Sequence, residues 1–160
     1  MTRDELSHLD AEGRARMVDV GDKSETDRRA RAQARVVVGT DIVARLRSGE
    51  SPKGNVIETA RIAGIQAAKR TAEWIPLCHQ LPLSHVGVDV EIADDTLVVT
   101  TEARTRARTG VEMEALVAAS AAALTLYDML KAWSHDLVIR DVRLLEKSGG
   151  RSGTYRAGER

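Results

Sequence analysis

The 160-residue chain is short of several residue types, and each shortage excludes a class of structure. Its single cysteine, Cys78, excludes an intramolecular disulfide and a multi-cysteine metal centre. It has no phenylalanine, two tryptophans and two tyrosines. It has no excess of charge either: 24 basic and 24 acidic residues leave a formal net charge of zero, which removes any overall attraction to nucleic acid or an anionic membrane. Any basic site must therefore be local.

Long apolar segments and targeting signals are also missing. The longest apolar stretch, from Ala115 to Leu126, is interrupted by Ser120 and Thr125 and is shorter than the ~20 residues that a bilayer requires. The charged N-terminus lacks the apolar h-region of a secretory signal. With the single cysteine, these features predict a cytoplasmic protein that has no membrane partner.

The apolar residues that are present, mostly Ala, Val, Leu and Ile, predict an α+β domain. The elements expected from hydrophobic periodicity are a strand at 30–38, a short helix at 41–47 capped by Thr40, a helix at 55–71, strands at 86–92 and 96–106, a helix at 111–132 and a strand at 137–145. This order is the ferredoxin-like pattern, a four-stranded antiparallel sheet with helices packed on one face. The other face of such a sheet needs a cover or a partner.

The length is that of one domain. Residues 1–16 are expected to form a flexible N-terminal arm, residues 17–153 a single domain and residues 154–160 a C-terminal tail. No structure is assigned to the first dozen residues. Inside the domain, Ala60, Gly64 and Ala68 form a helical stripe of small residues, and a second stripe runs from Ala118 to Ala123, so both helices are expected to pack very closely.

Familiar short motifs are absent. The chain has no G-x-G-x-x-G, no Walker lysine loop, no H-E-x-x-H and no paired C-x-x-C. Its four histidines have no zinc-site spacing, so no protein-bound metal is expected.

Asp128 and Lys131 lie three residues apart near the end of the long helix, so their side chains can meet. They form either an ordinary surface ion pair or an acid/base couple with a partly desolvated lysine of lowered pKa. At the start of the helix, Glu112 and Glu114 are either carboxylates that favour a helix N-terminus or acceptors for a guanine-like edge. Glu114 and Asp128 are about 21 Å apart along the axis, so one small-molecule site that uses both requires a long ligand or two copies of the helix.

Two irregular segments carry further candidates. Cys78 and His79 lie in a loop between Pro76 and Pro82, where the imidazole could bind a phosphate, a base or a local backbone group. Several cations adjoin glycine and could approach an anion together with backbone N–H groups, or could simply be solvated; these are Lys53, Lys147 and Arg151.

Several stretches taken together resemble the MoaC family, the cyclic pyranopterin monophosphate synthases of molybdenum-cofactor biosynthesis. The resemblance covers about residues 17–153, and its main blocks are MVDV at 17–20, KGNV at 53–56, ARIAGIQAAKRT at 60–71, IPLCH at 75–79, TGVEMEAL at 109–116, YDM at 127–129 with Lys131, and LLEKSGG at 144–150.

The resemblance implies a phosphorus–oxygen lyase reaction, in which (8S)-3′,8-cyclo-7,8-dihydroguanosine 5′-triphosphate becomes cyclic pyranopterin monophosphate and diphosphate. It implies a homohexamer, a trimer of dimers with sites at a dimer interface. Asp128 and Lys131 match the catalytic positions. Substrate-binding positions are matched by Leu77, Cys78, His79, Glu112, Met113 and Glu114, and positions around the triphosphate by Lys53, Lys147 and Arg28.

The resemblance implies no required cofactor, although Mg²⁺ could accompany the triphosphate. The chain departs from the family pattern at Arg108 and Arg151, where the family often has lysine; this keeps the charge and changes the hydrogen-bond geometry.

The first alternative to this enzyme function is a non-catalytic nucleotide- or RNA-binding module on the same fold. Because the expected strands lack aromatic residues for base stacking, no nucleic-acid partner is expected. The second alternative is a small-molecule sensor, which would bind its ligand without turnover.

Overall fold

The structure is a computed structural model that describes residues 8–151 and 153–158. Its elements are β1 (Thr26–Val37), α1 (Thr40–Arg47), α2 (Val56–Ala68), α3 (Thr71–Trp74), β2 (Leu83–Ile92), β3 (Thr96–Ala107), α4 (Glu112–Leu130), β4 (Val138–Ser148) and β5 (Tyr155–Arg156). The expected strands and helices are all present, with boundaries shifted by a few residues.

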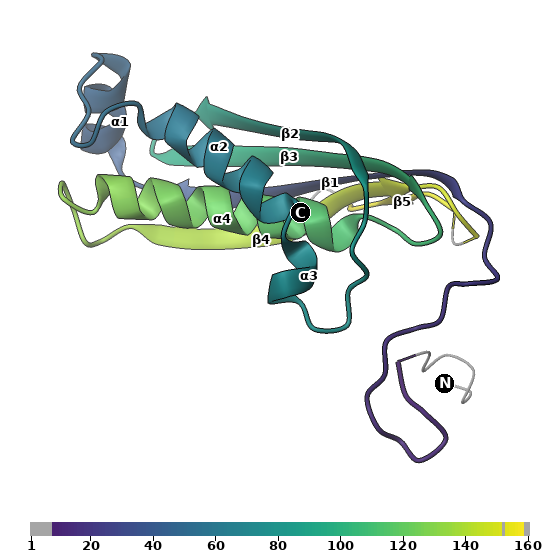
Figure 1. Cartoon of the computed structure of the whole chain (residues 1–160). Coiled ribbons are helices and arrows are strands. Elements are labelled where there is room, and N and C mark those ends of the chain that lie inside the picture. Colours follow the sequence, from purple (N-terminus) through teal and green to yellow (C-terminus); the bar gives the residue numbers. More distant parts are fainter. Residues whose placement is uncertain (1–7, 152, 159–160) are drawn as a thin grey trace.

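The strands form one sheet in the order β2-β3-β1-β4-β5, and every adjacent pair is antiparallel. The helices α2 and α4 lie across one face (Figure 1). The ferredoxin-like α+β fold predicted from the sequence is confirmed. The sheet has a fifth strand because Tyr155 and Arg156, within the expected tail, pair with Lys147 and Glu146 at the end of β4.

The core lies between the sheet and the helices. Along β1, Ala30, Ala32, Ala34 and Val36 are completely buried, while the polar residues between them lie on the opposite face. Helix α4 closes the core with Leu126 and Leu130, which are also completely buried. Because the strand residues under α4 are mostly alanine and valine, the helix can lie close to the sheet.

Helix α4 is the one described helix that is long and apolar enough to cross a membrane by length and composition. Most of its residues are buried inside the fold, against α2 and the four strands β1 to β4. Its apolar character is therefore accounted for by its place in the core.

The two stripes of small residues meet inside the chain, as their composition predicted. Ala60 and Ala68 are buried, and between them Gly64 faces the turn of α4 that contains Ala118 and Ala122. A Cβ atom built on Gly64 would lie 2.9 Å from the carbonyl oxygen of Ala118 and 3.0 Å from Cγ2 of Val88. The missing side chain thus permits the close contact between the helices and the sheet.

Three local expectations are wrong. Thr40 does not cap the first helix, because Gly39, with φ of 85°, occupies the N-cap position and Thr40 is already helical. The helix expected to reach residue 71 ends at Ala68 and is followed by the separate short helix α3. The first dozen residues are not wholly without structure: Asp10 closes a turn by accepting from the backbone and side chain of Arg14. Residues 1–7 of the expected arm lie outside the described residues.

Replacing Gly64 by alanine is expected to destabilise the fold by about 1–3 kcal/mol, because the added methyl group has no room between α4 and β2. Gly158→Ala is the matched control, since a Cβ atom there meets nothing within 4 Å. Urea unfolding of both variants measures the difference. Equal free energies of unfolding would show that the helices can separate without cost.

Candidate active site

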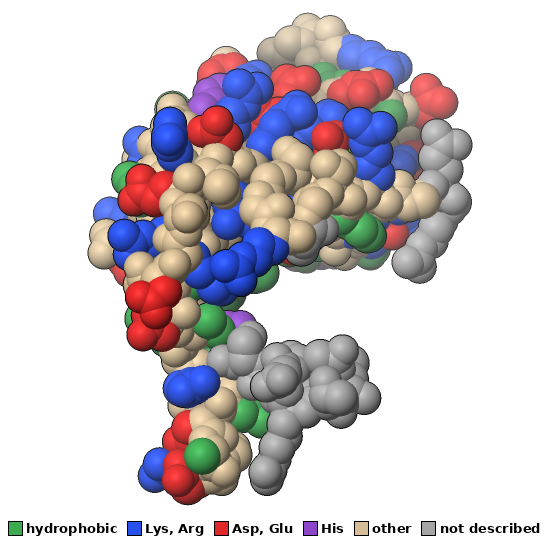
Figure 2. All heavy atoms as spheres, turned by 90° about the vertical axis from the view of Figure 1, so that its right-hand side faces the viewer, with side chains coloured by type: hydrophobic (Ala, Val, Ile, Leu, Met, Phe, Trp, Pro, Cys, Tyr) green, Lys and Arg blue, Asp and Glu red, His purple; other side chains and the backbone are tan. Residues whose placement is uncertain are grey.

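Six basic side chains surround a cavity of about 520 Å³ at the end of the molecule where β1 begins and α4 starts. They come from distant parts of the sequence and are Lys23, Arg28, Arg29, Arg108, Lys147 and Arg151. Figure 2 looks onto this end of the molecule and shows Lys and Arg side chains gathered on it. The neutral chain therefore has a basic site that is local, the one kind that its composition allows.

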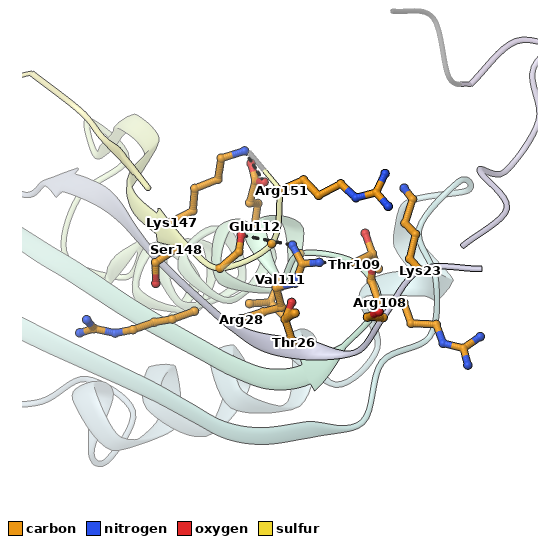
Figure 3. A pocket seen from close by; sticks show the side chains of 15 residues that line it. Lys23, Thr26, Arg28, Arg108, Thr109, Val111, Glu112, Lys147, Ser148 and Arg151 are labelled. Atoms are coloured by element: carbon orange, nitrogen blue, oxygen red, sulfur yellow. Dashed lines mark hydrogen bonds and ion pairs between the residues drawn. The ribbon is translucent and has the colours of Figure 1, made fainter. Parts of the chain in front are cut away.

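Two glycines after β4 shape this cavity. Gly149 and Gly150 have φ of 97° and 75°, and a Cβ atom on Gly150 would overlap the guanidinium group of Arg28. Arg28 donates hydrogen bonds to the carbonyl oxygens of Gly149, at 3.3 Å, and Arg108, at 3.4 Å. The glycines thus let the loop fold over Arg28 and fix the position of its charge (Figure 3).

Glu112, in the first turn of α4, pairs with Lys147 of β4 at 2.8 Å between Oε1 and Nζ. Both side chains are partly exposed at the cavity wall. The pair connects the helix to the strand and places the lysine at the N-terminus of α4, where backbone N–H groups and the helix dipole also favour an anion.

A second cavity, of about 360 Å³, adjoins the first and shares Lys23, Thr109, Gly110 and Glu112 with it. Besides Glu112, it is lined by five further residues that the sequence predicted as substrate-binding, namely Leu77, Cys78, His79, Met113 and Glu114. The structure thus brings the loop before β2 together with the first turn of α4.

The segment before β1 forms one wall of this second cavity. Val18 and Val20 line it, and the carbonyl oxygen of Val18 lies 2.8 Å from Nε2 of His79. Nearby, Arg108 donates to the carbonyl oxygen of Gly21 at 2.7 Å. Of the alternatives for His79, the local backbone contact is therefore present in this structure, and it orients the ring within the cavity.

Burial raises the pKa of the two titratable groups on the inner side of this cavity. Glu114 is 4% exposed, and burial raises the pKa of its carboxyl group. Burial, assisted by the negative charge of Glu114, also raises the pKa of the Cys78 thiol, so Cys78 is not an activated nucleophile here.

A third group of charged residues lies at the opposite end of α4. Asp128 contacts Lys131, with 2.6 Å between Oδ1 and Nζ, and Lys53 from the loop before α2, with 3.3 Å between Oδ2 and Nζ. Lys53 also donates to the carbonyl oxygen of Asp128 at 3.1 Å. One carboxylate therefore holds two ammonium groups.

Of the two alternatives for Asp128 and Lys131, the structure agrees with the exposed ion pair and not with a lysine of lowered pKa. Asp128 and Lys131 are about half exposed, because Met129 and Leu130 face the core and do not cover them. The hydrogen bond from Lys131, together with that from Lys53, lowers the pKa of Asp128. The hydrogen bond to Asp128 raises the pKa of Lys131, whereas the acid/base alternative supposed a lowered value. At neutral pH the pair is an ionised carboxylate and an ammonium ion.

A single chain does not bring all the predicted residues together. Lys147, Arg28, Glu112 and the five residues of the second cavity lie around the start of α4, whereas Lys53, Asp128 and Lys131 lie at its end. The fourteen helical steps from Glu114 to Asp128 correspond to about 21 Å. Lys53, predicted to lie near the other phosphate-binding cations, is thus on the far side of its own chain.

Sequence reasoning missed Lys23, which lines both cavities. It stands between Asp22 and Ser24 with no periodic or glycine-rich context, so no local signal distinguished it from a solvated lysine. Among the described residues, no group of three or more His, Cys, Asp or Glu could hold a metal ion.

The buried Glu114 carboxyl group predicts a pH-dependent stability. Because its pKa is higher in the folded than in the unfolded chain, its burial lowers the free energy of unfolding progressively as pH rises from the unfolded value of about 4.3. Glu114→Gln is expected to be more stable than the parent at pH 7, with a difference that shrinks toward pH 4. Urea unfolding at both pH values measures this, with the exposed Glu73→Gln as control. A Glu114→Gln difference that does not change with pH would contradict the assignment.

Comparison with known proteins shows the family of the chain. A model of the MoaC family matches residues 17–150. The chain is 54% identical to a protein of Thermomicrobium roseum named cyclic pyranopterin monophosphate synthase, over 95% of this chain and 93% of that protein. Proteins of the same name from Streptomyces griseus and Herpetosiphon aurantiacus are 53% and 55% identical, over 97% and 94% of this chain and 88% and 93% of their own lengths. The chain belongs to the MoaC family.

Proposed function

We propose that this protein is a cyclic pyranopterin monophosphate synthase. It converts (8S)-3′,8-cyclo-7,8-dihydroguanosine 5′-triphosphate to cyclic pyranopterin monophosphate and diphosphate, an early step of molybdenum-cofactor biosynthesis. The observation that carries the proposal is the basic cavity at the start of α4, joined to the cavity around Cys78 and His79, in a chain of this family.

The basic cavity binds the triphosphate in this proposal. Arg28 and Lys147 are held in place by the Gly149 carbonyl and by Glu112, so they meet the phosphates with little further ordering. When the α-phosphate closes its ring, diphosphate leaves, and the cations stabilise the negative charge that develops on it. Side-chain cations neutralise the phosphates, so the proposal requires no cofactor. Mg²⁺ enters only as an ion bound to the triphosphate.

The adjoining cavity binds the guanine-derived part of the substrate. Glu114 accepts hydrogen bonds from adjacent N–H donors of the base, and Met113, Leu77 and Cys78 provide the apolar wall. His79 contributes a polar ring whose orientation is set by Val18. This arrangement recognises the base edge without aromatic stacking.

Asp128 and Lys131 move protons while the purine-derived skeleton is rebuilt. Their protonation states suit these roles, since an ionised Asp128 can accept a proton and the Lys131 ammonium can donate one. Lys53, bound to the same carboxylate, keeps Asp128 ionised until substrate arrives.

The separation along α4 is bridged when the acid/base group and the phosphate-binding group come from different copies of the chain. We place each site at a dimer interface in a cytoplasmic homohexamer, a trimer of dimers. One copy supplies Arg28, Lys147 and Glu114, and another supplies Asp128, Lys131 and Lys53.

Turnover tests the activity directly. Purified protein given the cyclic dihydroguanosine triphosphate is expected to release diphosphate and the pyranopterin product. Asp128→Asn is expected to lower kcat by about 10²-fold or more, since it removes the proton acceptor. Asp136→Asn, an exposed acid in the loop after α4, is the control and should match the parent. Absence of product from the parent, or full activity of Asp128→Asn, would contradict the proposed function.

Mixing two inactive variants tests the shared site. Co-refolded Asp128→Ala and Glu114→Ala chains are expected to regain about one quarter of the parent activity, because a random mixture forms that fraction of sites with both halves intact. Each variant refolded alone is the control and stays inactive. If the mixture also stays inactive while its mass equals that of the parent, each site is built from a single chain.

A further inference from the structure

Arg45, in the last turn of α1, contacts two segments that are far apart in the sequence. Its guanidinium group lies over the ring of Trp133, in the turn after α4, with 3.8 Å between Cζ and the ring centroid. Its Nε atom donates a hydrogen bond to Oε2 of Glu50, in the loop between α1 and α2, at 2.9 Å. Helix α1 and the end of α4 lie at the same end of the molecule (Figure 1).

The same two segments supply the lysines that hold Asp128. Glu50 stands three residues before Lys53, and Trp133 stands two residues after Lys131. The two lysines contact different oxygens of the Asp128 carboxylate, at 3.3 Å and 2.6 Å. Arg45 therefore connects the two segments at a second place, away from the carboxylate that they share.

The loop that carries Lys53 is stiffened by hydrogen bonds on either side of the lysine. The N–H group of Glu50 donates to the carbonyl oxygen of Arg45 at 3.0 Å, so these two residues are joined through the backbone as well as through their side chains. The Ser51 hydroxyl donates to the carbonyl oxygen of Gly54 and accepts from the N–H group of Lys53 at 3.4 Å. Fixing Glu50 thus fixes the backbone from which the Lys53 side chain extends.

The turn that carries Lys131 continues directly from α4. The N–H group of Lys131 donates to the carbonyl oxygen of Tyr127 at 2.9 Å, and that of Trp133 donates to the carbonyl oxygen of Leu130 at 2.8 Å. The Trp133 side chain packs against the hydrophobic core. A cation over the exposed side of this ring stabilises its position, because the face of an indole ring attracts positive charge.

Arg45 is not needed to attach α1 to the rest of the fold. In the same turn, Arg47 donates to the carbonyl oxygens of Ile92 and Ala93 at 3.1 and 3.3 Å, and Val43 of this helix is buried in the core. The two contacts of Arg45 thus serve the segments that it touches rather than its own helix.

The group around Asp128 has need of such support. The side chains of Asp128, Lys131 and Lys53 are about half exposed. Exposed ion pairs are weak, because two long side chains must be ordered in water to form them. Restraint of the backbone on both sides lowers this cost of ordering.

We propose that Arg45 is a positioning residue for the reaction. Through Glu50 and Trp133 it fixes the two segments that present Lys53 and Lys131, and so keeps both ammonium groups on Asp128. The inference rests on the proposed function for its chemical meaning, since that function gives Asp128 and Lys131 their roles in proton transfer.

Chemical labelling of lysines tests the contact without substrate. The native full-length protein is treated briefly with acetic anhydride, and acetylation at each lysine is measured by mass spectrometry. In Arg45→Gln, Lys53 and Lys131 are expected to react about two- to fivefold faster than in the parent, because an amine held by a carboxylate is less available. The exposed Lys69, at the end of α2, is the internal standard and keeps its rate.

Three further variants locate the effect. Trp133→Leu is expected to accelerate mainly Lys131, and Glu50→Ala mainly Lys53, because each removes one of the two contacts. Arg47→Gln removes the same charge from the same turn of α1 and is the matched control, with the rates of the parent expected at both lysines. Thermal unfolding confirms that each variant is folded.

Turnover of the cyclic dihydroguanosine triphosphate supplies the second readout. Arg45→Gln is expected to lower kcat about tenfold, because misplaced groups transfer protons poorly. Its KM stays that of the parent, since the cavities proposed to bind substrate lie at the other end of α4. Arg47→Gln is expected to keep both constants. A general loss of folded protein would leave the KM and the labelling rates of the remaining enzyme unchanged.

Three results would overturn the proposal: parent labelling rates at Lys53 and Lys131 in folded Arg45→Gln, equal acceleration in Arg47→Gln, or a raised KM with an unchanged kcat. The labelling result does not depend on turnover. A parent without activity whose Arg45→Gln variant shows the expected acceleration would count against the proposed function alone. An active parent with no such acceleration would count against the role of Arg45 alone.

Discussion

The burial of α4 is the constraint on which the rest of the structure depends. Because this helix lies between α2 and the sheet, its residues cannot shift without opening the core. Its length then separates Glu114 from Asp128 by about 21 Å, so the basic cavity and the acid/base group are held at opposite ends. Because this separation is rigid, the proposed reaction depends on the association of two copies of the chain.

The different character of the two faces of the sheet follows from the alternation of small apolar and polar residues along β1. On one face, alanines and Val36 lie under α4 and let it approach closely. On the other face, arginines and a glutamine alternate with them. The scarcity of aromatic residues is consistent with both faces, since close helix packing and a flat, charged face each leave little room for large rings.

Much of the fold could be predicted from the sequence because its periodicities are clean. The alternation in β1 and β2 and the stripe around Gly64 identified the sheet, the helices and their contact. The site could be predicted only in part. The candidate residues around Cys78 and Glu114 do line one cavity and Asp128 does meet Lys131, but the exposure of that pair and its contact with Lys53 were not foreseen. Whether Met129 and Leu130 cover that carboxylate depends on how α4 is rotated against the sheet, and Lys23 gains its position only from a chain path that no local pattern encodes.

The central claim is that one site combines the start of α4 from one copy with the end of α4 from another. A crystal structure of the Asp128→Asn variant with the cyclic dihydroguanosine triphosphate bound tests it most directly. The account predicts phosphates on Arg28 and Lys147 of one copy, with Lys131 and the substituted side chain at position 128 of a second copy beside the ring system. A substrate molecule that contacts Lys131 and Lys147 of the same chain, or that lies away from the basic cavity, would contradict it.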